Sequence, residues 1–148
     1  MKVLDSISQV VRQKNSATWS IHPDATVYDA LKTMAEREIG ALPVIQEGKL
    51  LGLISERDYA RKVILVGRSS KETKVSDIMT RPPMTVTPEC SVDEAMRTMT
   101  EQRVRHLPVV GPEGNLVDIV SIGDLVKWII SSHEKTIEQL ESYISGSA

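Results

Sequence analysis

The sequence has few of the residues on which several common kinds of protein depend. Its 148 residues include no Phe, two Trp, three Tyr, three His and one Cys. The lone Cys90 cannot form an internal disulfide, which suits a reducing compartment. Three scattered His residues without ligand spacing predict no metal site. Because aromatic residues are so few, we expect an aliphatic core built from Val, Ile and Leu.

Excess charge of one sign and long apolar runs are also missing. The 18 basic and 20 acidic residues leave a net charge of -2, which favours neither nucleic acid nor an anionic membrane as a partner. The most apolar stretches, Val63–Val66 and Leu125–Ile130, are far shorter than the roughly 20 residues of a spanning helix. The first residues are too polar for a signal peptide. We therefore expect a cytoplasmic protein with no membrane segment.

One pattern occurs twice. Residues 50–58 read LLGLISERD and residues 116–124 read LVDIVSIGD, so an apolar run twice ends in Ser, two further residues and Asp. Each copy predicts a buried strand that leads into a helix, because Ser is a favoured cap and a carboxylate suits a helix N-terminus. Helix capping alone explains one copy, whereas two copies indicate an internal repeat.

The repeat extends over most of the chain. A shift of 65 residues, which becomes 66 after an insertion near Pro112, places like residues together, and these pairs are Pro23 with Pro88, Val27 with Val92, Ala30 with Ala95, Met34 with Met99, Pro43 with Pro108, Ser55 with Ser121 and Asp58 with Asp124. The predicted fold is α/β (α+β), with two βαββα repeats packed about a pseudo-twofold axis.

Local patterns give the expected elements. In the first half they are a leading helix over residues 3–12, after which Asn15 and Ser16 break the pattern, a strand over 18–21, a helix over 27–38, a hairpin of 42–45 and 49–54, and a helix from Ser55 to Val66. In the second half they are a short helix over 75–79, a strand over 84–86 and a helix capped by Ser91. The expected domains are a leading segment (1–16), repeat one (17–68), a linker with a short helix (69–81), repeat two (82–130) and a helical tail (131–148).

The doubled pattern resembles a tandem pair of cystathionine-β-synthase (CBS) motifs, also called a Bateman module. The resemblance covers about Thr18 to Trp128 and depends on ALPVI with GLISERD in one half and HLPVV with DIVSIGD in the other. It implies that the halves form a disc with two clefts that bind adenosine-containing ligands, without catalysis.

The resemblance also implies which residues form each cleft, with the Asp of one repeat facing the other repeat. The first cleft would contain Ser55, Asp58, Met84, Arg103, Val104, Arg105, His106 and Pro108. The second would contain Thr18, Trp19, Ile39, Ala41, Pro43, Ser121 and Asp124. An ionised Asp accepts hydrogen bonds from both ribose hydroxyls, Ser adds a donor, and the apolar strand edge covers the adenine.

Two differences favour the first cleft. Arg103, Arg105 and His106 offer charge-assisted bonds to a phosphate. The second repeat has Asp118 where the first has Gly52, which adds bulk and negative charge near Asp124. The alternative for the Arg and His residues is a solvated surface or an ion pair with Glu101, and for Trp19 it is a core or dimer contact instead of adenine cover.

The tail carries a separate signal. Apolar residues and one His step alternately by four and three, at Val126, Ile130, His133, Ile137, Leu140 and Ile144. This is a short heptad seam, and the helix either packs on its own disc or pairs with a second subunit.

The predicted function is that of a regulatory sensor, not an enzyme. It would bind an adenine nucleotide, with AMP favoured over ATP, ADP or NAD(H), and control an unknown partner protein through a conformational change. We expect a homodimer formed through the disc and the terminal helix. The alternatives are a purely structural dimerisation module and a sensor of S-adenosylmethionine.

Overall fold

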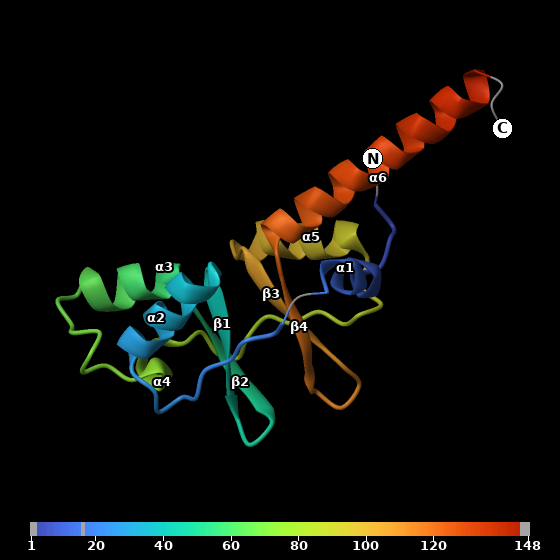
Figure 1. The fold of residues 1–148 in the computed structure, drawn as a ribbon. Helices are drawn as coiled ribbons and strands as arrows, with labels where there is room; N and C mark the ends of the chain where they lie inside the picture. Colours follow the sequence, from blue (N-terminus) through green and yellow to red (C-terminus); the bar gives the residue numbers. More distant parts are fainter. Residues whose placement is uncertain (1–2, 16, 146–148) are drawn as a thin grey trace. The chain divides into compact units, whose positions relative to one another are not determined.

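The computed structural model describes residues 3–15 and 17–145, so Ser16 of the predicted helix break and residues 146–148 of the tail lie outside the described residues. Pairs of strands lie between groups of helices along the chain (Figure 1). The elements of the first half are α1 (Ile7–Lys14), α2 (Val27–Arg37), β1 (Ala41–Gln46), β2 (Lys49–Ser55), α3 (Glu56–Tyr59) and the π-helix η1 (Ala60–Ile64). Those of the second half are α4 (Val75–Ile78), α5 (Val92–Gln102), β3 (His106–Val110), β4 (Leu116–Ser121) and α6 (Ile122–Ile144).

The chain divides into two compact units that do not follow the predicted repeats. The first unit combines residues 1–15, 88–107 and 120–148, and the second combines 16–87 and 108–119. Strands β3 and β4 form a two-stranded sheet. The predicted domain boundaries and the packing about a pseudo-twofold axis stay predictions.

The β1–β2 hairpin is the centre of the second unit. Its antiparallel register joins Ala41 to Ser55, and its two-residue turn places Glu47 and Gly48 at φ 51° and 77°. Positive φ at both turn residues matches the right-handed twist of the strands. The predicted hairpin is therefore confirmed, with slightly longer strands. Helix α2 packs against β1, and both contribute to the aliphatic core, whose fully buried members include Val27, Ala30, Leu42, Val44, Ile54 and Val75.

The predicted strands over residues 18–21 and 84–86 are wrong in extent. Each consists of one parallel bridge, Ile21 to Val44 and Val86 to Val109. Ile21 N–H donates to the Pro43 carbonyl at 3.0 Å, and Ile21 accepts from Ile45 N–H at 3.0 Å. To extend each bridge toward the C-terminus, the next backbone N–H donor would have to come from residue 23 in the first segment and from residue 88 in the second. Both are proline, which has no N–H, so the ladder ends there.

Two helices pack on a different repeat from the one that they directly precede in sequence. Helix α1 precedes the first repeat but pairs with the start of the second, where Ile7 N–H donates to the Cys90 carbonyl at 2.8 Å and Ser8 N–H to the Pro88 carbonyl at 2.9 Å. In the other half, Val75 N–H of α4 donates to the Ala25 carbonyl at 2.8 Å. Figure 1 shows α4 beside α2. We call α1 and α4 the exchanged helices.

The exchange explains why the leading helix is shifted from its predicted range. The carbonyls of Val3 and Asp5 accept from Asp93 and Val92 N–H, which keeps these residues extended, and α1 begins only after the Ser6 cap. The helix predicted from Ser55 to Val66 divides into α3 and η1, and the chain turns at Gly67 with φ 73°. Helix α6 is continuous over 23 residues.

Candidate ligand-binding sites

The Asp58 site is built where β2 runs into α3. Ser55 has extended backbone angles, and its hydroxyl oxygen accepts from Asp58 N–H at 3.2 Å. In return, Ser55 N–H and Oγ donate to Asp58 Oδ2 at 2.9 and 3.0 Å. This capping box fixes the carboxylate at the helix start. The helix cap therefore uses one carboxylate oxygen, while Oδ1 makes other contacts.

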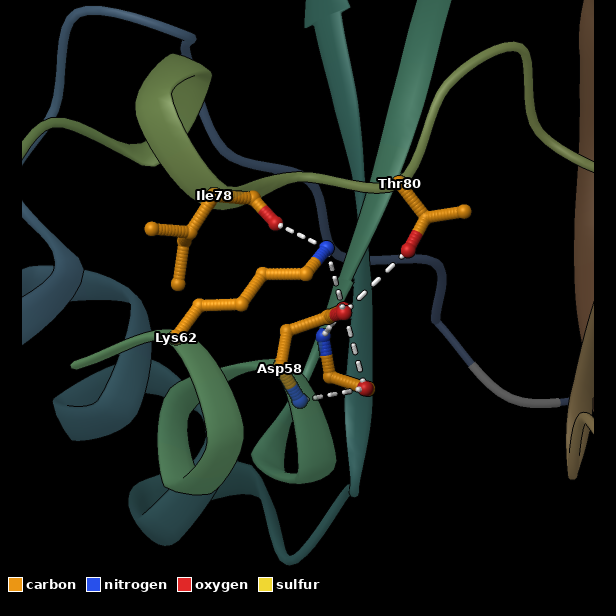
Figure 2. A network of polar contacts seen from close by, with 5 residues as sticks. Asp58, Lys62, Ile78 and Thr80 are labelled. Carbon is orange, nitrogen blue, oxygen red and sulfur yellow. Dashed lines mark hydrogen bonds and ion pairs between the residues drawn. The ribbon is translucent and has the colours of Figure 1, made fainter. Parts of the chain in front are cut away.

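Two side chains contact the second oxygen of Asp58. Thr80 Oγ1 donates to Asp58 Oδ1 at 3.1 Å, and Lys62 Nζ lies 3.2 Å from the same atom. The Lys62 ammonium also donates to the Ile78 carbonyl oxygen at 2.9 Å, as Figure 2 shows. The Asp58 side chain is only 13% exposed and that of Lys62 is 44% exposed. The carboxylate thus lies in a small polar network formed by α3, η1 and the end of α4.

The Asp124 site repeats the cap with a different cation. Ser121 N–H donates to Asp124 Oδ2 at 2.8 Å, and the Ser121 hydroxyl accepts from Asp124 N–H at 3.1 Å. Lys14 Nζ, at the end of exchanged helix α1, lies 3.1 Å from Asp124 Oδ2. Both of these side chains are about one quarter exposed, at 24% and 25%. A lysine therefore pairs with each aspartate, from a local helix in one site and from α1 in the other.

Arg105 and His106 lie beside the Asp124 site within the first unit. The Arg105 carbonyl accepts from Ile122 N–H at 2.9 Å, which ties this segment to the start of α6. Burial lowers the pKa of His106. The Asp124 carboxylate opposes this by raising it, while Lys14 and Arg105 lower it further. The neutral imidazole is therefore favoured, and the permanent positive charges of this group belong to Arg105 and Lys14.

The other two residues predicted before β3 have backbone roles. Arg103 ends α5 with φ 55°, and Val104 N–H donates to the Met99 carbonyl at 3.0 Å.

The residues predicted on the strand side are placed in the second unit. Thr18 Oγ1 donates to Asp118 Oδ1 at 3.3 Å. Trp19 stacks under the Arg37 guanidinium, whose Cζ lies 3.7 Å from the ring centroid. One face of the indole is therefore already covered by a cation, although Trp19 remains 37% exposed.

The remaining predicted residues of the second unit differ in their environments. Ala41 is buried, and the carbonyls of Pro43 and Pro108 accept hydrogen bonds from the backbone N–H groups of Ile21 and Val86. Met84 is 42% exposed.

The equivalent positions 52 and 118 have different local environments, which suit a glycine in one repeat and an aspartate in the other. A Cβ on Gly52 would lie 2.7 Å from the Thr80 carbonyl oxygen and 3.0 Å from Met79 Sδ, so the close approach of the α4 end to β2 requires glycine. Asp118 is only 5% exposed, and it accepts from Ile119 N–H at 2.7 Å as well as from Thr18. Its carboxylate is hydrogen-bonded where it lies.

An open cavity of about 290 Å³ lies in the second unit at the C-terminal end of α2. It is lined by Leu31, Met34, Ala35, Glu38, Ile39, Gly40 and Glu56. Ile39 is the one predicted site residue among them, and neither Ser55 nor Asp58 is included. The cavity is therefore separate from the carboxylate network of Figure 2.

The structure thus groups the predicted residues within units. It brings Ser55 to Asp58, and it brings Ser121, Arg105 and His106 to the neighbourhood of Asp124. The cross-repeat combinations, such as Asp58 with Arg105, join residues of different units and stay predictions.

Sequence reasoning missed Lys14, Lys62 and Thr80. The four-residue spacing from Asp58 to Lys62 was a usable signal, because residues so spaced meet on a helix. Lys14 and Thr80 had no local signal.

The described residues, 3–15 and 17–145, hold neither a candidate metal cluster nor a helix that could span a membrane. They contain no group of three His, Cys, Asp or Glu side chains arranged to hold a metal ion. Within the same part of the chain, no helix has the length and apolar character needed to cross a membrane.

Comparisons with known proteins agree with this architecture. The family model described as CBS domain matches residues 8–65 and 75–131. The chain is 44% identical over 151 residues to the mitochondrial CBS domain-containing protein CBSX3 of Arabidopsis thaliana, covering 95% of this chain and 72% of the relative. It is 34% identical over 106 residues to the CBS domain-containing protein YhcV of Bacillus subtilis, covering 72% of this chain and 74% of that protein.

A solved structure gives the same result in three dimensions. A protein with CBS domains from Burkholderia ambifaria matches with a TM-score of 0.81 and 45% identity, covering 86% of this chain and 95% of that one. Two matched segments, repeated capping boxes and this shared fold lead to one conclusion: the chain belongs to the CBS domain family and carries two CBS repeats.

Proposed function

We propose that this protein is a regulatory sensor that binds an adenosine-containing ligand at its Ser-x-x-Asp sites and thereby controls a partner protein. The observation that carries the proposal is the pair of identical capping boxes, in which Ser55 and Ser121 hold Asp58 and Asp124 at a strand end. A fixed, ionised carboxylate is suited to accept the two vicinal hydroxyls of a ribose. AMP is the favoured ligand, followed by ATP, ADP and NAD(H).

The charges near Asp124 support a phosphorylated ligand. Arg105 lies with Asp124 in one unit, and its guanidinium can bind a phosphate through two parallel hydrogen bonds. Because burial favours neutral His106, this imidazole supports the proposal as a hydrogen-bonding group and not as a charge. The predicted addition of residues from the other repeat remains part of the proposal for both sites.

A melting experiment tests the proposal. A ligand at about 100 times its dissociation constant should add roughly 2.7 kcal/mol to the free energy of unfolding. AMP, ADP, ATP, NAD(H) and S-adenosylmethionine are compared on the wild-type chain, on Asp58→Asn and on Asp124→Asn, because each variant keeps the side-chain shape but loses the charge. No shift with any ligand on the wild-type chain would refute the sensor. A shift with S-adenosylmethionine alone would support the alternative ligand.

We propose that the action is regulatory and not catalytic, and that the compartment is the cytoplasm. Nucleotide turnover by purified protein would contradict the first statement, and fractionation of the source cells tests the second. The relative in Arabidopsis thaliana is named as mitochondrial, which is a property of that protein.

A second candidate function, self-association, is favoured by the exposed seam of α6. Four of its apolar members, Val126, Ile130, Ile137 and Leu140, are 42–57% exposed. Their spacing is that of a helix that pairs with another helix, and a second copy carries the matching seam. The other face is held in the first unit, where Trp128 Nε1 donates to Asp5 Oδ2 at 2.9 Å.

Analytical ultracentrifugation tests this second function. Ile137→Asp with Leu140→Asp should convert dimers into monomers, while Glu138→Gln with Glu141→Gln serves as the control in the same helix. A dimer that persists in the Asp variant would exclude the seam as the interface. Loss of the dimer together with a complete lack of nucleotide binding would favour a structural module over a sensor.

A further inference from the structure

We infer that Lys62 is an internal competitor of the ligand, because its ammonium occupies the oxygen of Asp58 that a ribose hydroxyl must use. The inference rests on the proposed function and adds regulation to the Asp58 site. It concerns the network of Figure 2, which lies entirely within the second unit.

The carboxylate of Asp58 has few acceptor positions left. Its Oδ2 accepts from the Ser55 backbone and hydroxyl, at 2.9 and 3.0 Å. Its Oδ1 accepts from Thr80 Oγ1 at 3.1 Å and lies 3.2 Å from Lys62 Nζ. Each carboxylate oxygen has two lone pairs, so these four contacts use the positions available. A ribose diol can bind to Asp58 only when one donor leaves.

Thr80 is held in place more firmly than Lys62. Its backbone pairs with β2 in both directions, since Thr80 N–H donates to the Leu53 carbonyl at 2.8 Å and Leu53 N–H donates to the Thr80 carbonyl at 3.0 Å. The Lys62 side chain is flexible and 44% exposed. It also has a second acceptor, the Ile78 carbonyl at 2.9 Å, to which it stays bonded after leaving Asp58. The ammonium is therefore the group that a hydroxyl displaces.

Displacing the Lys62 ammonium from Asp58 lowers the affinity for the ligand by an amount that depends on electrostatics. The ligand must break an ion pair at a partly exposed site before its own hydrogen bonds form. A partly exposed pair of this kind contributes modestly and is weakened by salt. Lys62 thus lowers the affinity of the Asp58 site for a ribose, and it does so less at high ionic strength.

Calorimetric titration with adenosine tests this competition, because adenosine has the diol but no phosphate. Lys62→Met keeps most of the side-chain length and removes the ammonium. It should bind adenosine about two- to fivefold more tightly than the wild-type chain, the factor that corresponds to a partly exposed ion pair. Lys49→Met is the matched control, since it removes a charge from the exposed start of β2 and should leave the affinity unchanged.

Ionic strength provides a readout that a structural role would not change. Between about 0.05 and 0.5 M salt, the wild-type affinity for adenosine should rise more than that of Lys62→Met, because salt screens the pair that adenosine must break. If Lys62→Met does not fold, as judged by melting without ligand, Lys62→Gln replaces it and retains a donor for the Ile78 carbonyl.

The outcomes separate this inference from the function on which it rests. Equal or weaker adenosine binding by the Lys62 variants, with binding by the wild-type chain intact, would overturn the competition and leave the sensor standing. Binding by Lys62→Met but not by the wild-type chain would support it strongly. If wild-type and Lys62 variants all fail to bind any adenosine-containing ligand, the proposed function itself fails and the inference falls with it.

Discussion

The two Ser-x-x-Asp sites have the same helix cap but obtain their cations in different ways. At Asp58 the ammonium comes from Lys62, four residues later on the same helical segment. At Asp124 it comes from Lys14, at the end of α1 and far away in sequence. The carboxylate geometry is thus repeated, while the group that covers the carboxylate is local in one site and brought by an exchanged helix in the other.

This difference determines what each site can influence. Displacing Lys62 frees a side chain whose ammonium remains bonded to the Ile78 carbonyl. Displacing Lys14 removes a contact between α6 and the end of α1, which holds the leading segment to the start of α5. A ligand at Asp124 would therefore loosen the leading segment, whereas a ligand at Asp58 would change a local network.

The largest expected effect concerns Gly52, three residues before the first Ser-x-x-Asp motif, where the second half has Asp118. Gly52→Ala would place a Cβ 2.7 Å from the Thr80 carbonyl oxygen, so β2 or the end of α4 must move. We expect the free energy of unfolding to fall by about 1–3 kcal/mol, the usual range for overpacking. Chemical denaturation measures it.

Gly123→Ala, a glycine substitution inside the second Ser-x-x-Asp motif, is the control in the other half. Its Cβ would meet only Ser121 Oγ at an ordinary 3.6 Å, and Ala favours a helix over Gly by up to about 1 kcal/mol. Unchanged stability of Gly52→Ala would contradict the close approach of the α4 end to β2.

The repeat itself was predictable from sequence because its signals are local. Ser55 and Ser121 are caps with reciprocal Asp contacts, and the hairpin turn at Glu47 and Gly48 lies where the pattern predicts it. These features depend on residues a few positions apart, whose interactions are fixed by helix and turn geometry.

The exchanged helices could not be predicted in this way. The periodicity of residues 3–12 indicated a helix, but the extended pairing of Val3 and Asp5 with the start of α5 depends on a partner far along the chain. The same holds for Lys14 at Asp124. Similarly, the short strands near Ile21 and Val86 read as strands from their composition, yet Pro23 and Pro88 stop the ladder after one bridge. Tertiary pairing decided each of these points.

Removing the caps tests whether the two sites are truly alike. Ser55→Ala and Ser121→Ala each delete an acceptor for the Asp N–H, at 3.2 and 3.1 Å, and we expect each to lower the free energy of unfolding by about 1 kcal/mol. Equal losses in thermal or chemical denaturation would sharpen the comparison. A loss at one Ser alone would show that one box does not form in solution. Ser142→Ala, away from both helix starts, is the control.

A smaller effect should separate the two lysines. Lys14→Met should lower the free energy of unfolding by about 0.5 kcal/mol, as is typical of a partly exposed ion pair, and should speed amide exchange at the end of α1. Asn15 N–H, which donates to the Val11 carbonyl at 3.2 Å, is the most direct reporter. Lys62→Met should leave the exchange rate in α1 unchanged. Equal protection of α1 in both variants would contradict the coupling of Asp124 to the leading segment.

The smallest effect, and the most specific to the Asp124 site, is the titration of His106. Burial lowers its pKa below the ordinary 6.5, Asp124 raises it, and Lys14 and Arg105 lower it. Removing Lys14 in Lys14→Met should therefore raise the pKa, and removing the carboxylate charge in Asp124→Asn should lower it, relative to the wild-type chain. The imidazole chemical shifts, followed by NMR through a pH titration, give the order of the three His106 pKa values directly.

The same shift has a consequence for stability, with a definite sign. A histidine whose folded pKa is depressed contributes stability that is present above pH 6.5, its unfolded value, and is lost as the pH falls toward the folded pKa. The wild-type chain should therefore lose more stability below pH 6.5 than His106→Gln, which cannot titrate there. Because Lys14→Met raises the folded pKa, its acid loss should be intermediate. If all three profiles coincide, His106 does not lie in the buried, cationic environment that makes the Asp124 site different from the Asp58 site.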